Sequence, residues 1–220
     1  GILAGAASYL RPEGGRGLTL DNEHLPAPES PYYTTDAFTD HALQFVGEQK
    51  DDKPFFLYLA FNAPHWPLQA KEEDIQKFTK LYRSKGWDKI RQERYNRMQK
   101  MGIIDKNVGF AEWENRSWDE LTEKEKDESA YRMAVYAAQV HCVDYNVGKV
   151  IDYLKKTKQL DNTLILFLAD NGACAEPYLE LGGGKQEDIN NPACNNMPSY
   201  GRAWAQTSNT PFRKYKCRSY

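Results

Sequence analysis

Two short apolar runs stand out along a chain that otherwise mixes polar and apolar positions. They cover residues 55–61, Phe-Phe-Leu-Tyr-Leu-Ala-Phe, and residues 163–169, Thr-Leu-Ile-Leu-Phe-Leu-Ala. Nearly unbroken apolar runs of this length are typical of strands that are covered on both faces, as in a parallel sheet. We therefore predict that both segments are buried strands.

Helical patterns precede each of these runs. Thr34, Thr35 and Asp36 are N-cap candidates for a helix over about residues 36–49, because short polar side chains can accept hydrogen bonds from the first helical amides. Its predicted apolar face consists of Ala37, Phe38, Ala42, Phe45 and Val46. From about 129 to 157, apolar residues recur every three or four positions; they are Tyr136, Val140, Val143, Val147, Val150 and Leu154. This order of strand, helix and strand predicts an α/β fold with a mostly parallel central sheet flanked by helices.

The segment from about 71 to 128 is highly charged. Its basic positions cluster over some twenty residues, namely Lys80, Arg83, Lys85, Lys89, Arg91, Arg94, Arg97 and Lys100. The pattern favours a solvated helical insertion, and a surface that attracts a polyanionic substrate is the alternative. A nucleic-acid interface is the weakest interpretation, because no recognised binding module accompanies the charge. For residues 1–35 and 172–220, both rich in turn-forming residues, we predict loops.

Composition narrows the class of protein. With 220 residues, 40% apolar residues and a net charge of -2, the chain suits one globular domain and offers no general attraction to nucleic acid or to an anionic membrane. No apolar run approaches the roughly 18 residues of a membrane span. The four cysteines lack the paired short spacing of a zinc site. Cys174 and Cys194 could form a disulfide, and free buried thiols are the alternative.

Candidate chemistry follows the two predicted strands, because ligands of a parallel sheet gather at the carboxyl ends of its strands. Beyond the first run lies Asn62-Ala63-Pro64-His65-Trp66-Pro67, and beyond the second lies Asp170-Asn171-Gly172. A histidine held between prolines can donate a proton near neutral pH, although a structural loop histidine has the same appearance. The carboxylate and amide oxygens of Asp170 and Asn171 suit Ca²⁺ or Mg²⁺, although this tripeptide is also a common turn.

Two lysines near the end of the chain complete the candidate set. Lys214 and Lys216 lie in Thr-Pro-Phe-Arg-Lys-Tyr-Lys, residues 210–216. A lysine ammonium is a compact charge that suits a sulfate or phosphate oxyanion. Taken singly, each is equally well explained as a surface lysine.

Taken together and in order, these motifs resemble the central part of the arylsulfatase family, within the alkaline phosphatase superfamily. The matching segments are residues 33–38, 54–58, 63–70, 136–138, 144–148, 161–172 and 208–216. The resemblance implies a partial alkaline-phosphatase-like sandwich. It also implies that residues 1–220 are the central part of one sulfatase catalytic domain, incomplete at both ends, with the charged insertion at about 71–128.

The resemblance also implies roles for particular residues. Asp170 and Asn171 resemble two of the four protein ligands of the family's calcium ion. His65 resembles the histidine that contacts the sulfate ester and assists departure of the leaving group. Lys216 resembles the lysine that binds the sulfate oxygens, and it is preferred to Lys214 because Tyr220 falls where the family has Tyr-Glu-Gly-Gly.

The family's nucleophile is a formylglycine made from a Cys or Ser in a C/S-x-P/A-x-R motif, and this chain has no such motif. The 220-residue chain alone is therefore expected to be inactive and to bind calcium poorly. The implied substrate is a sulfated small molecule or glycan, and family members are often periplasmic or secreted. A phosphodiesterase or phosphatase of the same superfamily and a non-catalytic relative that binds sulfated glycans are the alternatives.

Overall fold

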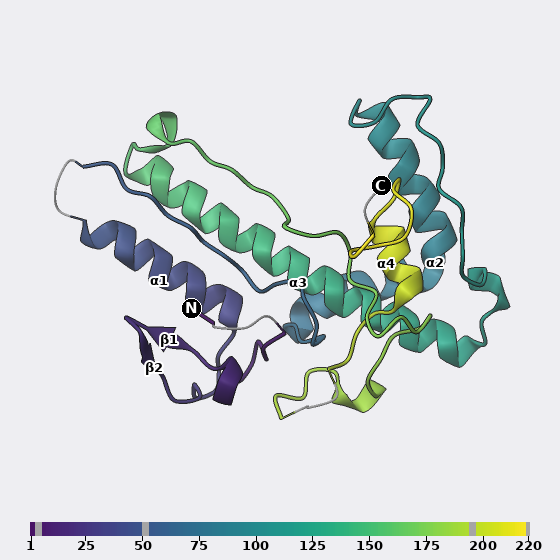
Figure 1. Cartoon of the computed structure of the whole chain (residues 1–220), viewed down its shortest axis with the longest axis horizontal. Coiled ribbons are helices and arrows are strands. Elements are labelled where there is room, and N and C mark those ends of the chain that lie inside the picture. Colours follow the sequence, from purple (N-terminus) through teal and green to yellow (C-terminus); the bar gives the residue numbers. More distant parts are fainter. Residues whose placement is uncertain (3–5, 50–52, 194–196, 219–220) are drawn as a thin grey trace.

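The computed structural model describes residues 1–2, 6–49, 53–193 and 197–218, and most of its regular structure is helical (Figure 1). The helices are α1 (Thr34–Glu48), α2 (Glu72–Lys100), α3 (Glu123–Lys156) and the short α4 (Arg202–Ser208). The single-turn 3₁₀ helices are η1 (Gly14–Arg16), η2 (Trp118–Glu120), η3 (Leu160–Asn162) and η4 (Gln186–Asp188). The long helix α3 is central: α1 packs along its second half, and α2 crosses its first half together with α4.

Helix α3 begins six residues earlier than the sequence pattern predicts. The side chain of Thr122 accepts a hydrogen bond from the amide of Glu125, and the carboxylate of Glu125 accepts one from the amide of Thr122. This reciprocal capping box stabilises the first turn. Val143 and Leu154 of the predicted apolar stripe are buried, whereas Val140 is 42% exposed.

Helix α1 confirms the predicted helix but begins at Thr34, two residues before the predicted start. Its buried residues are Thr34, Thr35, Thr39 and Ala42, whereas Phe45 of the predicted apolar face is 49% exposed. The helix runs in the same direction as α3, since Asp36 contacts Asn146 and Asp40 contacts Lys149. Small and polar residues on the buried face let the two helices approach closely.

Helix α2 bends at Gly86, which has a φ of 63° inside the helix. A Cβ at this position would lie 2.2 Å from the ring of Trp118, so only glycine fits. Beside this bend, Trp87, Trp118 and Trp204 pack with ring centroids 4.8–5.7 Å apart. These indoles join α2, η2 and α4 in the main hydrophobic core.

Of the eight basic residues predicted to cluster between positions 80 and 100, all of them in α2, four make contacts within the fold. Arg83 pairs with Glu123 and Asp127, and Lys85 pairs with Glu93. The guanidinium of Arg91 lies 3.9 Å from the ring centroid of Phe110, and Nε of Arg94 donates to the carbonyl of Thr210. The others are exposed, namely Lys80, Lys89, Arg97 and Lys100. The charge of this helix therefore serves the fold as well as the surface.

The predicted parallel sheet is absent from the residues that the structure describes. The one sheet there is a two-stranded antiparallel hairpin of β1 (Thr19–Leu20) and β2 (Glu23–His24). Residues 55–61 and 163–169 run as extended chain on the surface without a strand ladder. Phe56 is 94% exposed and Leu164 is 86% exposed. The prediction of buried strands was wrong for this structure, because a strand is stable only beside partner strands and a covering layer.

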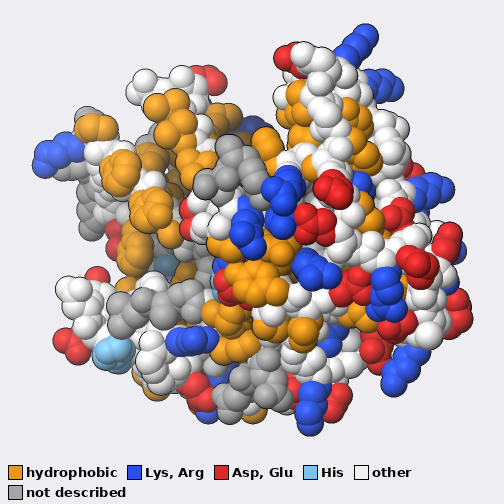
Figure 2. Space-filling view, turned by 45° about the vertical axis from the view of Figure 1, so that its right-hand side comes forward, with side chains coloured by type: hydrophobic (Ala, Val, Ile, Leu, Met, Phe, Trp, Pro, Cys, Tyr) orange, Lys and Arg blue, Asp and Glu red, His pale blue; other side chains and the backbone are white. Residues whose placement is uncertain are grey.

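Exposure along the first of these segments still alternates with the period of a strand. Phe55, Leu57 and Leu59 are half-buried, while Phe56 and Tyr58 are exposed. In the space-filling view, apolar side chains gather on the side of α1 and the two extended segments (Figure 2). Acidic and basic side chains intermingle on the side of α2. One face of residues 55–61 is therefore partly covered in this structure, and the opposite face is exposed.

The region after Asn171 contains an element that the sequence pattern did not predict. Helix α4 is only seven residues long, yet Ala203, Trp204 and Ala205 on it are fully buried. A helix of two turns has too few positions for a periodic signal, so its burial decides its structure.

The described cysteines form no disulfide with one another. Among the described residues, Cys142, Cys174 and Cys217 are free, and Cys194 of the predicted disulfide lies outside those residues. Within the described chain, no helix is long and apolar enough to cross a membrane.

Candidate active site

The segment that carries His65 is held by its backbone. The amide of His65 donates to the carbonyl of Asn62 over 3.0 Å. The hydroxyl of the fully buried Tyr9 lies within hydrogen-bond distance of two carbonyl oxygens, that of Asn62 at 3.0 Å and that of His65 at 2.7 Å. From α3, Nε2 of Gln139 donates to the carbonyls of His65 and Pro67. Two buried side chains from distant parts of the chain therefore fix the position of His65.

The imidazole of His65 is oriented by its neighbour. Nδ1 lies 2.8 Å from the carbonyl oxygen of Trp66, and the two rings are 4.8 Å apart. A carbonyl oxygen accepts only, so Nδ1 carries the proton in this contact and Nε2 of the neutral ring is the basic nitrogen. The ring therefore presents Nε2 for exchange of a proton with a ligand.

Two buried polar groups of this segment lack partners among the described residues. Neither atom of the Asn62 amide makes a hydrogen bond, and Nε1 of Trp66 has no acceptor. Each such group costs about 1–3 kcal/mol of desolvation. The polar groups on both sides of His65 can therefore bind a ligand, water or residues from outside the described chain.

Asp170 and Asn171 follow the second extended segment and are both exposed. Directly after them the chain passes close to Asn209, whose Oδ1 accepts from the amide of Ala173 over 3.4 Å. A Cβ on Gly172 would lie 2.9 Å from the same oxygen. Gly172 and Ala173 therefore lie in contact with Asn209, which belongs to the segment 208–216.

The structure places Lys216 beside this turn. Its amide donates to the carbonyl of Ala173 over 2.9 Å, and its ammonium lies 3.7 Å from a carboxylate oxygen of Glu176. Lys214 instead pairs with Glu114 at 3.2 Å. Among the described residues, no hydrogen bond or ion pair joins His65 to Asp170, Asn171 or Lys216. Lys216 and the Asp170–Asn171 turn are therefore brought together, and His65 stands on a separate segment.

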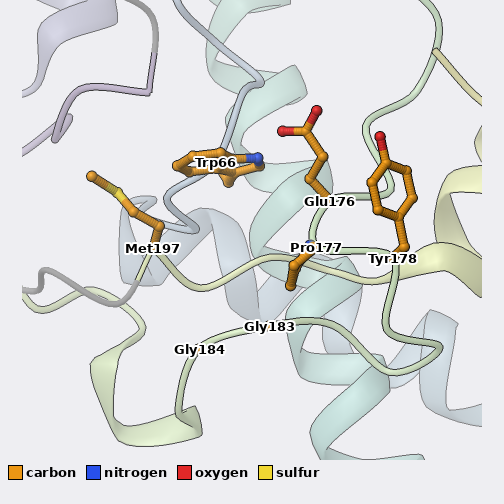
Figure 3. A pocket seen from close by; sticks show the side chains of 7 residues that line it. All are labelled: Trp66, Glu176, Pro177, Tyr178, Gly183, Gly184 and Met197. Atoms are coloured by element: carbon orange, nitrogen blue, oxygen red, sulfur yellow. The ribbon is translucent and has the colours of Figure 1, made fainter. Parts of the chain in front are cut away.

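A pocket of about 410 Å³ lies between these two segments (Figure 3). Its lining comes from three stretches of chain and consists of Trp66, Glu176, Pro177, Tyr178, Gly183, Gly184 and Met197. Trp66 follows His65 directly, and Glu176 is the carboxylate beside Lys216. In the close view, the Trp66 ring lies across the pocket from Tyr178, with the Glu176 carboxylate between them. The pocket thus connects the surroundings of His65 to those of Lys216.

The wall formed by the glycines depends on Arg132 of α3. This buried side chain donates to the carbonyls of Gly183 and Ser199 at 2.7 Å and to that of Gly184 at 2.9 Å. Burial lowers the pKa of its guanidinium, with Glu128 acting in the opposite direction. Five donors in a rigid fork allow one arginine to satisfy several carbonyls at once. Arg132 therefore holds the loop that closes one side of the pocket.

The side-chain oxygens of Asp170 and Asn171 are of the kind that binds calcium, but they are too few to form a complete calcium site. One carboxylate and one amide oxygen suit this ion, which takes about six to eight oxygen ligands. Within the described residues, no group of three or more His, Cys, Asp or Glu side chains could hold a metal. The described chain thus supplies part of such a site.

Several residues of this site carried no signal in the sequence. Tyr9, Gln139 and Arg132 act through contacts 50 or more positions away along the chain, which no local pattern reveals. Glu176 and Tyr178 lie in a stretch without periodicity. Asn209 lies in the motif of residues 208–216, but no sequence pattern indicated its contact with Ala173.

A sequence model of the sulfatase family matches residues 9–214 of this chain. An uncharacterized sulfatase of Schizosaccharomyces pombe is 37% identical over 199 residues, which cover 84% of this chain and 35% of that protein. An arylsulfatase of Klebsiella aerogenes is 32% identical over 205 residues, which cover 90% of this chain and 44% of that protein. The chain thus spans less than half the length of these relatives.

A solved structure, Ps i-CgsB in complex with k-i-k-neocarrahexaose, is 34% identical and covers 68% of this chain and 23% of that one, with a TM-score of 0.40. The family match extends over most of the chain, from the Tyr9 that holds the His65 segment to Lys214. This chain belongs to the sulfatase family.

Proposed function

We propose that the protein containing this chain hydrolyses sulfate esters, and that residues 1–220 are the central part of its catalytic domain. The family match over residues 9–214 carries this proposal. The hydrogen bond from the amide of Lys216 to the carbonyl of Ala173 supports it, because it joins the segment of this lysine to the turn that carries the candidate metal ligands Asp170 and Asn171. The charged stretch at about 71–128 is an insertion within that domain.

Each candidate residue then has a role that its chemistry allows. Lys216 binds the sulfate oxygens, and the ammonium stabilises negative charge that develops on them. His65, with Nε2 protonated in the imidazolium form, donates that proton to the departing alcohol. Asp170 and Asn171 would hold calcium, which when bound supplies Lewis-acid stabilisation of the sulfate group. The formylglycine nucleophile comes from sequence that this chain does not contain.

We further propose that residues 55–61 and 163–169 become strands of a mostly parallel central sheet in the complete protein. Exposed apolar side chains such as Phe56 and Leu164 are what a strand shows when the layer that covers it is missing. The partner strands would come from outside this chain. The carboxyl ends of both strands then meet at one edge, which brings His65 and Asp170 to the same crevice.

The substrate class that we propose is a sulfated saccharide. An N-acetylglucosamine-6-O-sulfatase of Bacteroides thetaiotaomicron is 23% identical over 187 residues. The pocket beside Lys216 has an aromatic wall, Trp66 and Tyr178, of the kind that packs against the apolar face of a sugar ring.

Phosphoester hydrolysis is the second candidate, because a multifunctional alkaline phosphatase superfamily protein of Trinickia caryophylli is 30% identical over 145 residues. Release of nitrophenol from 4-nitrophenyl sulfate and from 4-nitrophenyl phosphate by the complete protein separates the candidates. We expect faster turnover of the sulfate, loss of activity with a calcium chelator and recovery on adding calcium. Faster turnover of the phosphate would favour the second candidate. Turnover of neither ester, together with binding of a sulfated glycan, would favour a non-catalytic relative.

A further inference from the structure

The pocket beside Lys216 has an unusual charge for a site that serves an anionic group. Among the described residues that line it, Glu176 is the one with a charged side chain, and Trp66, Pro177, Tyr178 and Met197 are apolar or aromatic. Its carboxylate lies 3.7 Å from the ammonium of Lys216, so this positive charge lies beside the negative charge of the pocket lining. Beyond Lys216, a substrate therefore meets a negative charge.

Tyr178 adds no charge to the pocket in neutral solution. Its hydroxyl contacts Sγ of Cys217 at 3.4 Å, and this hydrogen bond, with desolvation, raises the pKa of Tyr178 to about 12. The phenol thus stays protonated, and its ring forms the wall opposite Trp66 (Figure 3). The pocket therefore combines two aromatic surfaces with a single group, Glu176, that only accepts hydrogen bonds when ionised.

We propose, building on the sulfatase function above, that this pocket receives the alcohol part of the ester as an uncharged ring bearing hydroxyl groups. The ring packs against Trp66, and its hydroxyls donate to the carboxylate of Glu176. A second sulfate or a carboxylate on the same ring meets Glu176 at short range. Near a protein surface, two like charges about 4 Å apart repel strongly enough to lower the preference for such a ring about tenfold or more. Glu176 is therefore a specificity-determining residue that selects singly sulfated sugar units.

The test compares the complete wild-type protein with Glu176→Gln and Trp66→Ala. The substrates are a panel of monosaccharides that carry one sulfate or that sulfate plus a second one, and kcat/KM is measured by release of inorganic sulfate. Glu187→Gln is the matched control for the carboxylate, since Glu187 is exposed on η4 and does not line the pocket. Tyr145→Ala is the control for the aromatic ring, since Tyr145 is exposed on α3.

We expect the wild type to prefer the singly sulfated sugars by tenfold or more, and Glu176→Gln to reduce this preference about tenfold, as removal of a repulsion of that size requires. Trp66→Ala should raise KM for the sugars, and both controls should leave the preference unchanged. A uniform fall for all substrates in Glu176→Gln would mean that Glu176 acts only through Lys216, and it would overturn the proposal. An unchanged preference with normal turnover of 4-nitrophenyl sulfate would also overturn it, without touching the sulfatase function. Absence of turnover of every sulfate ester would instead contradict the sulfatase function itself.

Discussion

The backbone amide of Lys216 donates a hydrogen bond to the carbonyl oxygen of Ala173 over 2.9 Å. This one contact joins the segment that ends in Lys216 to the turn that begins with Asp170, although the two lie more than forty positions apart in the sequence. Both candidate lysines make ion pairs, Lys214 with Glu114 and Lys216 with Glu176. The hydrogen bond to Ala173 is the reason why we propose Lys216, and not Lys214, as the lysine that binds the sulfate oxygens.

The two lysines should differ in their effect on catalysis. In the complete protein, Lys216→Ala should lower kcat/KM for an aryl sulfate by about 10²-fold or more, as loss of one group that stabilises an oxyanion does. Lys214→Ala removes a pair near the surface and should change kcat/KM by no more than about fivefold. Steady-state kinetics of both variants decides, and a larger loss in Lys214→Ala would reverse the assignment.

Asp170 and Asn171 should control the response to calcium. Removal of groups that only support metal ligands already costs about 10–100-fold in affinity, so Asp170→Ala and Asn171→Ala should each raise the calcium concentration for half-maximal activity at least tenfold. Asp161→Ala is the matched control, because Asp161 is exposed on η3 before the second extended segment. Thermal stabilisation by calcium should shrink in parallel. An unchanged calcium requirement in both variants would exclude these residues as ligands.

Arg132 should matter for stability and for the shape of the pocket. Arg132→Met leaves the buried carbonyls of Gly183, Gly184 and Ser199 without this donor, at a cost of about 2–4 kcal/mol in the free energy of unfolding. Arg97→Met is the control, because Arg97 is an exposed arginine of α2. Urea denaturation of the complete protein measures both effects. Equal stability of the two variants would show that this loop does not depend on Arg132.

Two of the thiols should differ in reactivity. Burial raises the pKa of the Cys142 thiol to about 12, with the charge of Asp36 adding to the effect, whereas Cys217 is exposed. At pH 8 only about one Cys142 in 10⁴ is then a thiolate, which is the reactive form. Iodoacetamide under native conditions, followed by mass spectrometry, should modify Cys217 well before Cys142. Equal rates would mean that α1 and α3 open readily around Cys142.

The sequence predicted the long helices better than the sheet. The sequence pattern located the start of α1 to within two positions and that of α3 to within six, because the backbone hydrogen bonds of a helix lie within one segment. The N-cap of α1 is Tyr33, without a side-chain cap, and not one of the predicted residues 34–36. The apolar runs at 55–61 and 163–169 have strand composition, but a strand requires partners that the described chain does not provide. Helix α4 was missed because burial of Trp204, and not its seven-residue sequence, stabilises it.

For the candidate site, motifs revealed the groups that carry chemistry but not the groups that hold them. His65, Asp170, Asn171 and Lys216 stand in short motifs that a single sequence can show. The supporting contacts of Tyr9 and Arg132 span long stretches of chain and follow only from the fold.

The most direct test of the central claim is the rate of sulfate release by His65→Ala in the complete protein, measured with leaving groups of increasing pKa. If His65 protonates the departing alcohol, turnover of an alkyl or saccharide sulfate should fall by about 10²–10⁴-fold. A nitrophenyl sulfate, whose leaving group needs little protonation, should lose much less, and His24→Ala, an exposed residue of β2, should have no effect. An equal or negligible loss with every leaving group would contradict the assignment of His65 and with it this account of the site.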